Sequence, residues 1–327
     1  MHTWPCMIQA ALERYQLPIY LVAIGAGLGL GSVRPTLREP FEALLWPALA
    51  LLLFATFLQI PLLHLREAFA DRRFLSANLI GNFLLVPAVL ALVLPLLPED
   101  PAVRLGVVLV LVVPCTDWFI TFTALGRGDA ARALAVTPVN LVLQLLLLPV
   151  YLWLLVPTAD LARAFAWTEV LPAALALIAV PLAAAGLAER WIEAPGAPST
   201  RARWRAWAAL WPVPLLALVV FLIAGAQVGT VRGQTITLLA VVPVFVGYLA
   251  LALVLARCLA RFGGLAPPAG RTLAFSLGTR NSFVVLPLAL ALPPGWEGTA
   301  VVIVVQSLVE LGGMVVFLAV VPRLFRS

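Results

Sequence analysis

Long apolar stretches recur along the whole chain, separated by short segments that carry most of the charged residues. Each stretch has about 20 residues, which is enough for a helix to cross the hydrocarbon core of a bilayer. The pattern predicts an all-α polytopic membrane protein with no room for a sizeable soluble domain. Ten spans are expected, at residues 18–34, 41–63, 74–97, 105–125, 133–157, 170–188, 208–229, 235–256, 272–292 and 299–321.

Four of these spans carry polar residues near their middle, far from either membrane surface. In the fifth and tenth spans two polar residues lie four positions apart and therefore share one helix face. A similar pair, Asn78 and Asn82, lies in the third span. The candidate residues of the fourth, ninth, fifth and tenth spans are Pro114, Cys115, Thr116 and Asp117; Arg280 and Asn281; Asn140 and Gln144; and Gln306 and Glu310.

An internal duplication is indicated by the sequence Leu-Trp-Pro, which opens a span at residues 45–47 and again at 210–212. We therefore expect two repeats of five spans, at residues 1–165 and 166–327, within one membrane unit. Because five is an odd number, the second repeat enters the membrane inverted, as in many secondary transporters. Offsets of 165 or 166 residues relate three further pairs: Cys115 to Arg280, Asn140 to Gln306, and Gln144 to Glu310.

Composition and charge support the membrane interpretation. The chain is 63% hydrophobic and 11% charged, whereas soluble domains carry about 25% charged residues. All 21 basic residues are arginines, and most of those flanking spans lie on the side of the N-terminus. The positive-inside rule then places both termini in the cytoplasm, with the protein in the plasma (inner) membrane. The net charge of +6 is thereby explained by topology, and nucleic acid is not an expected partner.

The polar residues of the fourth and ninth spans are costly at membrane depth and therefore suggest a function. Pro114 breaks the helix, and non-helical backbone is tolerated there only inside protein or facing water. An ionisable side chain in a span is a functional candidate by default. We expect Asp117 to pair with Arg280, and Glu310 to remain able to gain and lose a proton. The alternative is a structural ion pair that holds two broken helices together.

Cys115 is the candidate ligand for a soft metal or metalloid. It follows a helix break and is expected near Arg280, and both would raise the fraction of thiolate. Thiolate prefers soft metals and metalloids, and a single such ligand gives the reversible capture that a carrier needs. Asn140 and Gln144 either line the same cavity or only join helices by hydrogen bonds. Cys6 and Cys258 are expected to be ordinary apolar residues.

Other patterns argue against competing functions. The glycine-rich residues 25–31 lie inside an apolar span, where close helix packing explains them better than phosphate binding does. No Walker A, HExxH or GxSxG pattern is present, so no ATPase partner, cofactor or enzymatic activity is expected. An intramembrane enzyme using Asp117 and Glu310 is disfavoured because the intervening Arg280 opposes a raised carboxylate pKa. A passive channel is a further alternative.

Three segments resemble the arsenite efflux permeases of the bile acid/arsenite/riboflavin transporter superfamily: VVPCTDWFITFTALGRGD, FSLGTRNSFVVLPLALAL and VVQSLVELGGMVVF. The resemblance is carried by Pro-Cys-Thr in the fourth span, Arg-Asn in the ninth and a glutamate in the tenth. It implies two inverted five-helix repeats whose discontinuous fourth and ninth helices cross. Asp117 departs from the pattern, since many members have a small or apolar residue there, and glycines follow Glu310 where a proline is expected.

The resemblance also implies a transport mechanism. Trivalent arsenite, or antimonite, would be exported in exchange for protons by alternating access. Cys115 would bind the metalloid, while Thr116, Asn281 and Gln306 hydrogen-bond its hydroxyls and Glu310 or Asp117 carries the proton. The main alternative is a cation-coupled organic-anion symporter of the bile acid type. Arg280 suits an anionic substrate, but it is a poor component of a cation site.

Overall fold

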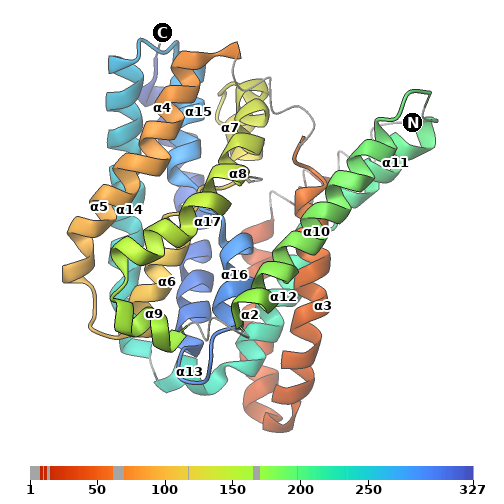
Figure 1. Ribbon diagram of the computed structural model, residues 1–327, viewed down its shortest axis with the longest axis vertical. Helices are drawn as coiled ribbons and strands as arrows, with labels where there is room; N and C mark the ends of the chain where they lie inside the picture. Colours follow the sequence, from red (N-terminus) through yellow and green to blue (C-terminus); the bar gives the residue numbers. More distant parts are fainter. Residues whose placement is uncertain are drawn as a thin grey trace. The chain divides into compact units, whose positions relative to one another are not determined.

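The computed structural model describes residues 8–9, 11–12, 15–61, 70–116, 118–164, 170–196, 198–233 and 235–326. This part of the chain is helical (Figure 1), and its only β-type pairing is a single antiparallel bridge between Pro114 and Arg280. Seven helical segments in it are long and apolar enough to cross a membrane, which confirms the predicted all-α polytopic architecture. These segments are Gln16–Val33, Pro35–Phe57, Arg72–Leu96, Ala130–Leu155, Ser199–Ala226, Leu238–Phe262 and Glu297–Leu324.

The predicted fourth and ninth spans each consist of two shorter helices with a non-helical break between them. The first pair is α6 (Pro101–Leu111) and α7 (Trp118–Leu125), and the second is α15 (Pro267–Gly278) and α16 (Ser282–Leu290). The predicted sixth span coincides with α10 (Val170–Ile192). The total of ten spans and the inverted relation of the two halves stay predictions.

The chain divides into two compact units, each of which draws on both halves of the sequence. Unit 1 comprises residues 1–59 and 168–235, and unit 2 comprises residues 60–167 and 236–327. The predicted repeats at 1–165 and 166–327 are therefore not the units in which the chain packs. Whether those halves are repeats stays a prediction.

Unit 1 is held together by close packing of α2 on α12. A Cβ atom placed on Gly27 would lie 2.3 Å from the carbonyl oxygen of Phe221, and one on Gly31 would lie 2.3 Å from that of Gly225. Gly27 and Gly31 thus serve helix packing, as expected from the sequence for this glycine-rich stretch. The helices of unit 1 are α2 (Gln16–Val33), α3 (Arg38–Phe57), α10, α11 (Ser199–Ala208), α12 (Pro212–Ala226) and α13 (Val228–Gly233).

Unit 2 contains both broken helix pairs and all the predicted site residues that the structure describes. Helix α6 is buried around its whole circumference, because α17 packs along it and α5, α8 and α16 also contact it. A π-helical turn (Gly81–Leu85) joins α4 to α5. The remaining helices of unit 2 are α4 (Arg72–Ile80), α5 (Val86–Val93), α8 (Ala130–Leu155), α9 (Thr158–Ala164), α14 (Thr235–Phe262) and α17 (Glu297–Leu324).

Candidate functional site

The two helix breaks, residues 112–116 and 279–281, lie side by side and are called the crossing segments below. Pro114 and Arg280 form the antiparallel bridge. On either side of it, the amide of Asn281 donates to the carbonyl of Val113 at 2.8 Å, and the amide of Cys115 donates to the carbonyl of Thr279 at 3.2 Å. Each break therefore supplies hydrogen-bond partners for the other, which removes part of the cost of non-helical backbone at membrane depth.

The guanidinium of Arg280 is buried between the ends of α6 and α15, and only 2% of the residue is exposed. Its Nη1 donates to the carbonyl oxygen of Leu111, the last residue of α6, at 3.2 Å. Its Nη2 donates to the carbonyl oxygens of Ser276 and Leu277, in the last turn of α15, at 3.1 and 2.9 Å. Both helices thus direct their C-terminal ends, which carry partial negative charge, at one positive charge.

Asn82 completes the surroundings of this guanidinium from a third segment. Its side-chain Oδ1 accepts from Nη2 of Arg280 at 2.6 Å, and its Nδ2 donates to Ser276 Oγ and Asn78 Oδ1, both at 3.1 Å. Asn82 lies in the π-helical turn Gly81–Leu85. Such turns often occur at functional sites. Here the turn carries an amide that contacts the crossing segments.

The side chain of Glu310 contacts the backbone of Arg280. Its Oε2 accepts from the amide nitrogen of Arg280 at 2.8 Å and from Nε2 of Gln306 at 2.7 Å. Gln306 Oε1 in turn accepts from the hydroxyl of Ser282 at 3.2 Å. A polar chain therefore runs from α17 to the beginning of α16. Within the described residues, the guanidinium of Arg280 forms no ion pair with a carboxylate, and the expected partner Asp117 lies outside those residues.

Cys115 and Thr116 are both buried in the first crossing segment, with 1% and 0% of their surfaces exposed. The Thr116 hydroxyl accepts from Nδ2 of Asn281 at 2.8 Å. Asn281 also caps α16, since its Oδ1 accepts from the amide of Val284 at 3.3 Å. Predicted site residues of the fourth and ninth spans thus make direct contact. Thr116 and Asn281 thereby help to hold the two helix breaks together.

The two polar residues of the predicted fifth span behave differently from each other. Asn140 Oδ1 accepts from Nδ2 of Asn78 at 2.8 Å, which joins it to the polar network of Asn82 and Ser276. Gln144 is 1% exposed, and neither polar atom of its side chain has a hydrogen-bond partner among the described residues. Asn140 thus joins two helices by a hydrogen bond, and a cavity-lining role stays a prediction for it. For Gln144, a cavity-lining role stays a prediction.

The cavities of unit 2 include the following two, both lined by described residues. One, of about 290 Å³, is almost wholly apolar and runs between α5 and α14. It is bounded by Leu111 and Tyr248, and the ring of Tyr248 lies 5.4 Å from the guanidinium carbon of Arg280. The cavity therefore reaches groups that contact the arginine.

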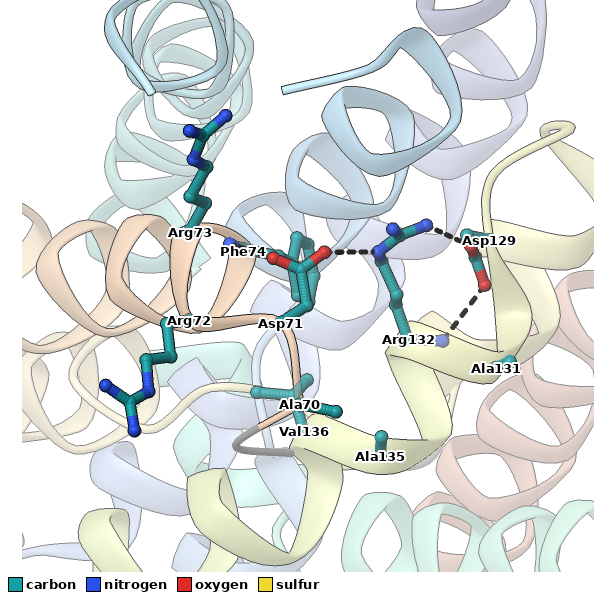
Figure 2. A pocket seen from close by; sticks show the side chains of 10 residues that line it. All are labelled: Ala70, Asp71, Arg72, Arg73, Phe74, Asp129, Ala131, Arg132, Ala135 and Val136. Carbon is teal, nitrogen blue, oxygen red and sulfur yellow. Dashed lines mark hydrogen bonds and ion pairs between the residues drawn. The ribbon is translucent and has the colours of Figure 1, made fainter. Parts of the chain in front are cut away.

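The second cavity, of about 820 Å³, lies at the N-terminal ends of α4 and α8 and contains none of the predicted site residues. Figure 2 shows Arg132 between two helix-capping carboxylates, Asp71 and Asp129, and donating to both. The amide of Phe74, followed by Arg132, lowers the pKa of Asp71 from its ordinary value of 3.8. Hydrogen bonds within the protein thus occupy the carboxylates of both Asp71 and Asp129.

The model of the sodium bile acid symporter family matches residues 46–234, more than half of the 327 residues. The chain belongs to the sodium bile acid symporter family. No curated protein matches it. Membership in a symporter family, together with the apolar helices, identifies the chain as a multi-pass membrane transporter.

The part of the chain that matches the symporter family includes the first crossing segment but ends before the second. It contains Pro114, Cys115 and Thr116, whereas Arg280 and Glu310 lie beyond residue 234. The family match therefore supports the kind of protein, while the composition of the site rests on the geometry of unit 2.

Sequence reasoning missed several groups that surround Arg280. Asn78 and Asn82 gave a signal, since two amides four residues apart in a span are unusual, but neither was predicted to belong to the site. Tyr248, whose hydroxyl donates to the carbonyl of Leu277 at 2.6 Å, gave none. The carbonyl oxygens that accept from Arg280 belong to apolar or small residues and have no signature in the sequence.

Proposed function

We propose that this transporter exports trivalent arsenite, and antimonite, from the cytoplasm across the plasma (inner) membrane in exchange for protons, with both termini cytoplasmic. The proposal makes it an arsenite efflux permease within the sodium bile acid symporter family. The observation that most supports this proposal is the bridge between Pro114 and Arg280. It joins two of the segments that resemble the arsenite efflux permeases. A thiol-bearing residue and an arginine, 165 positions apart in the sequence, thereby lie on adjoining segments.

Capture of the metalloid by Cys115 needs no net charge movement. Arsenite at neutral pH is an uncharged trihydroxide. The thiol proton would leave with one hydroxyl as water while a sulfur–arsenic bond forms, and the reverse reaction would release the substrate. Thr116 and Asn281, which are hydrogen-bonded to each other at 2.8 Å, offer a hydroxyl and an amide to the two remaining hydroxyls. Gln306 offers a second amide.

Proton coupling is assigned to Glu310. Its Oε2 accepts from both the Arg280 amide and Gln306. A proton taken up from outside would weaken these contacts, because a neutral carboxyl group is a poorer acceptor than a carboxylate. Gln306 would then be less well oriented toward the metalloid, which favours release on that side. Asp117 is the alternative proton carrier.

The test is uptake of arsenite into everted membrane vesicles under an imposed pH gradient. We expect Cys115→Ser to abolish uptake. Cys258→Ser, which alters an exposed free cysteine on α14, is expected to retain it. Glu310→Gln should remove the dependence on the pH gradient, whereas Glu297→Gln, at the first residue of α17, should not. Wild-type uptake by the Cys115 variant, or uptake that ignores the gradient in the unaltered protein, would contradict the proposal.

An organic-anion symporter is the second candidate, and the apolar cavity between α5 and α14 is the observation in its favour. Its volume of about 290 Å³ is at the lower limit of the roughly 300–1,000 Å³ typical of sites for drug-sized ligands. A small inorganic substrate fits this limit better than a steroid acid does. Uptake of a labelled bile acid by the same vesicles under a sodium gradient would favour the symporter instead.

A further inference from the structure

Four oxygen atoms from three chain segments converge on the guanidinium of Arg280. Three are backbone carbonyl oxygens, of Leu111, Ser276 and Leu277, and the fourth is Oδ1 of Asn82, at distances of 2.6 to 3.2 Å from the donating nitrogens. Uncharged oxygens at the C-terminal ends of interrupted helices are the ligands with which many transporters hold a coupling cation. The arginine therefore occupies a set of ligands that suits a cation.

Sodium, which the name of the family implies, does not fit beside this side chain. Every oxygen in the set already accepts a hydrogen bond from a group that stays protonated in proteins. A second cation at the same oxygens would have to displace those bonds and would be repelled by a charge that cannot be neutralised by proton loss. The face of Tyr248, 5.4 Å from the guanidinium carbon, adds a further contact favourable to a cation.

We propose that the guanidinium of Arg280 is a built-in cation that replaces a coupling sodium ion between the ends of α6 and α15. The inference rests on the proposed function only in treating the crossing segments as part of the transport pathway. A tethered cation stays in place throughout the transport cycle. It holds the two helix ends together as an ion would, but it carries no ion flux. The driving ion must then bind elsewhere, and Glu310 is the nearby group that can exchange a proton.

Removing the side chain should convert the built-in cation site into a site for a free one. In Arg280→Ala the four oxygens would lose the guanidinium, although the Leu277 carbonyl keeps the Tyr248 hydroxyl as a donor. Leaving buried acceptors unpaired destabilises the fold. A cation that binds the folded state then restores stability by mass action. Free guanidinium matches the lost group, and sodium matches the oxygen ligands. Arg280→Met fills the same space with an apolar chain and should respond to neither.

The experiment measures the thermal unfolding midpoint of detergent-solubilised protein in choline chloride and after exchange of choline for sodium or for guanidinium well below denaturing concentrations. We expect the midpoint of Arg280→Ala to be several degrees below that of the unaltered protein and to rise with either cation. The unaltered protein should show no preference for sodium over choline. Arg104→Ala is the matched control, since Arg104 also donates to two carbonyl oxygens, of Pro98 and Leu97, but near the beginning of α6. It should show no cation-specific rise.

Two results would overturn the proposal: stabilisation of the unaltered protein by sodium, and an Arg280→Ala variant that folds but gains nothing from either cation. If the alanine variant does not fold in any salt, Arg280→Lys decides. An Arg280→Lys variant that folds in choline and is not stabilised by sodium supports a built-in cation. A lysine variant that needs sodium to fold refutes it. No arsenite is present in these measurements, so their outcome is independent of whether the vesicles transport arsenite.

Discussion

Replacing Gly31 with alanine is expected to force α2 away from α12 and to destabilise unit 1. The added Cβ would lie 2.3 Å from the carbonyl oxygen of Gly225 and 2.9 Å from the carbonyl carbon and Cα of the same residue. Non-bonded atoms pack best at about 3.5–4 Å, so the helices must separate by roughly 1 Å. All three of these atoms are backbone atoms, which cannot rotate aside as the end of a side chain can. Overpacking of this kind costs about 1–3 kcal/mol.

The same helix supplies the controls. Gly25 and Gly29 lie on its exposed side, and a Cβ on either would meet nothing within 4 Å. Alanine there should be neutral or stabilising, since glycine is about 1 kcal/mol less favourable than alanine in a helix interior. The assay is the unfolding midpoint followed by tryptophan fluorescence, and a loss of 2 kcal/mol should lower it by roughly 4–8 °C. Equal midpoints for the variants at Gly31 and Gly29 would refute the packing argument.

Three further predictions concern unit 2 and use the same unfolding assay. Asp71→Asn should abolish an acid-sensitive contribution to stability. Because the pKa of Asp71 is lowered in the folded state, that contribution is present above the ordinary value of 3.8 and is lost as the pH falls below this value. Only the unaltered protein should therefore lose stability in this way on acidification. Asn82→Leu should cost about 1.5–3 kcal/mol, the usual value of a hydrogen bond to a charged group, whereas Asn82→Asp keeps an acceptor for Arg280 and should cost less; equal losses would contradict this. Tyr151→Phe removes a hydroxyl that donates at 2.6 Å to a carbonyl in the π-helical turn and should lower stability by about 1 kcal/mol, with an unchanged midpoint as the contrary result.

The broken helices were predictable because their cause is local. Pro114 cannot donate a backbone hydrogen bond, and Cys115 and Thr116 follow it directly in an otherwise apolar span. In the ninth span Arg280 and Asn281 give the same signal, since a charge at that depth must be buried against polar groups. These residues predict where two helices end, and an inverted repeat predicts that the two ends meet.

The partners of Arg280 were not predictable from the same residues. The sequence suggested a carboxylate, because ion pairs are the common way to bury an arginine. Among the described residues, the guanidinium donates to the carbonyl oxygens of Leu111, Ser276 and Leu277, and its pairing with Asp117 stays a prediction. A backbone carbonyl is the same in every residue type, so its availability depends only on where a helix ends. The π-helical turn that carries Asn82 could not be predicted from the sequence either, because no pattern of proline or glycine is specific to such a turn.

Arg280 and Asn281 both have structural roles, in addition to any contact with a substrate. The first satisfies carbonyl groups of α6 and α15, and the second caps α16 and pairs with Thr116. Substituting either one is therefore expected to disturb the crossing segments themselves, and loss of transport in such variants would not assign a substrate contact. Gln306 instead bonds side chains, those of Glu310 and Ser282, so transport by its variants is a more direct measure of metalloid binding.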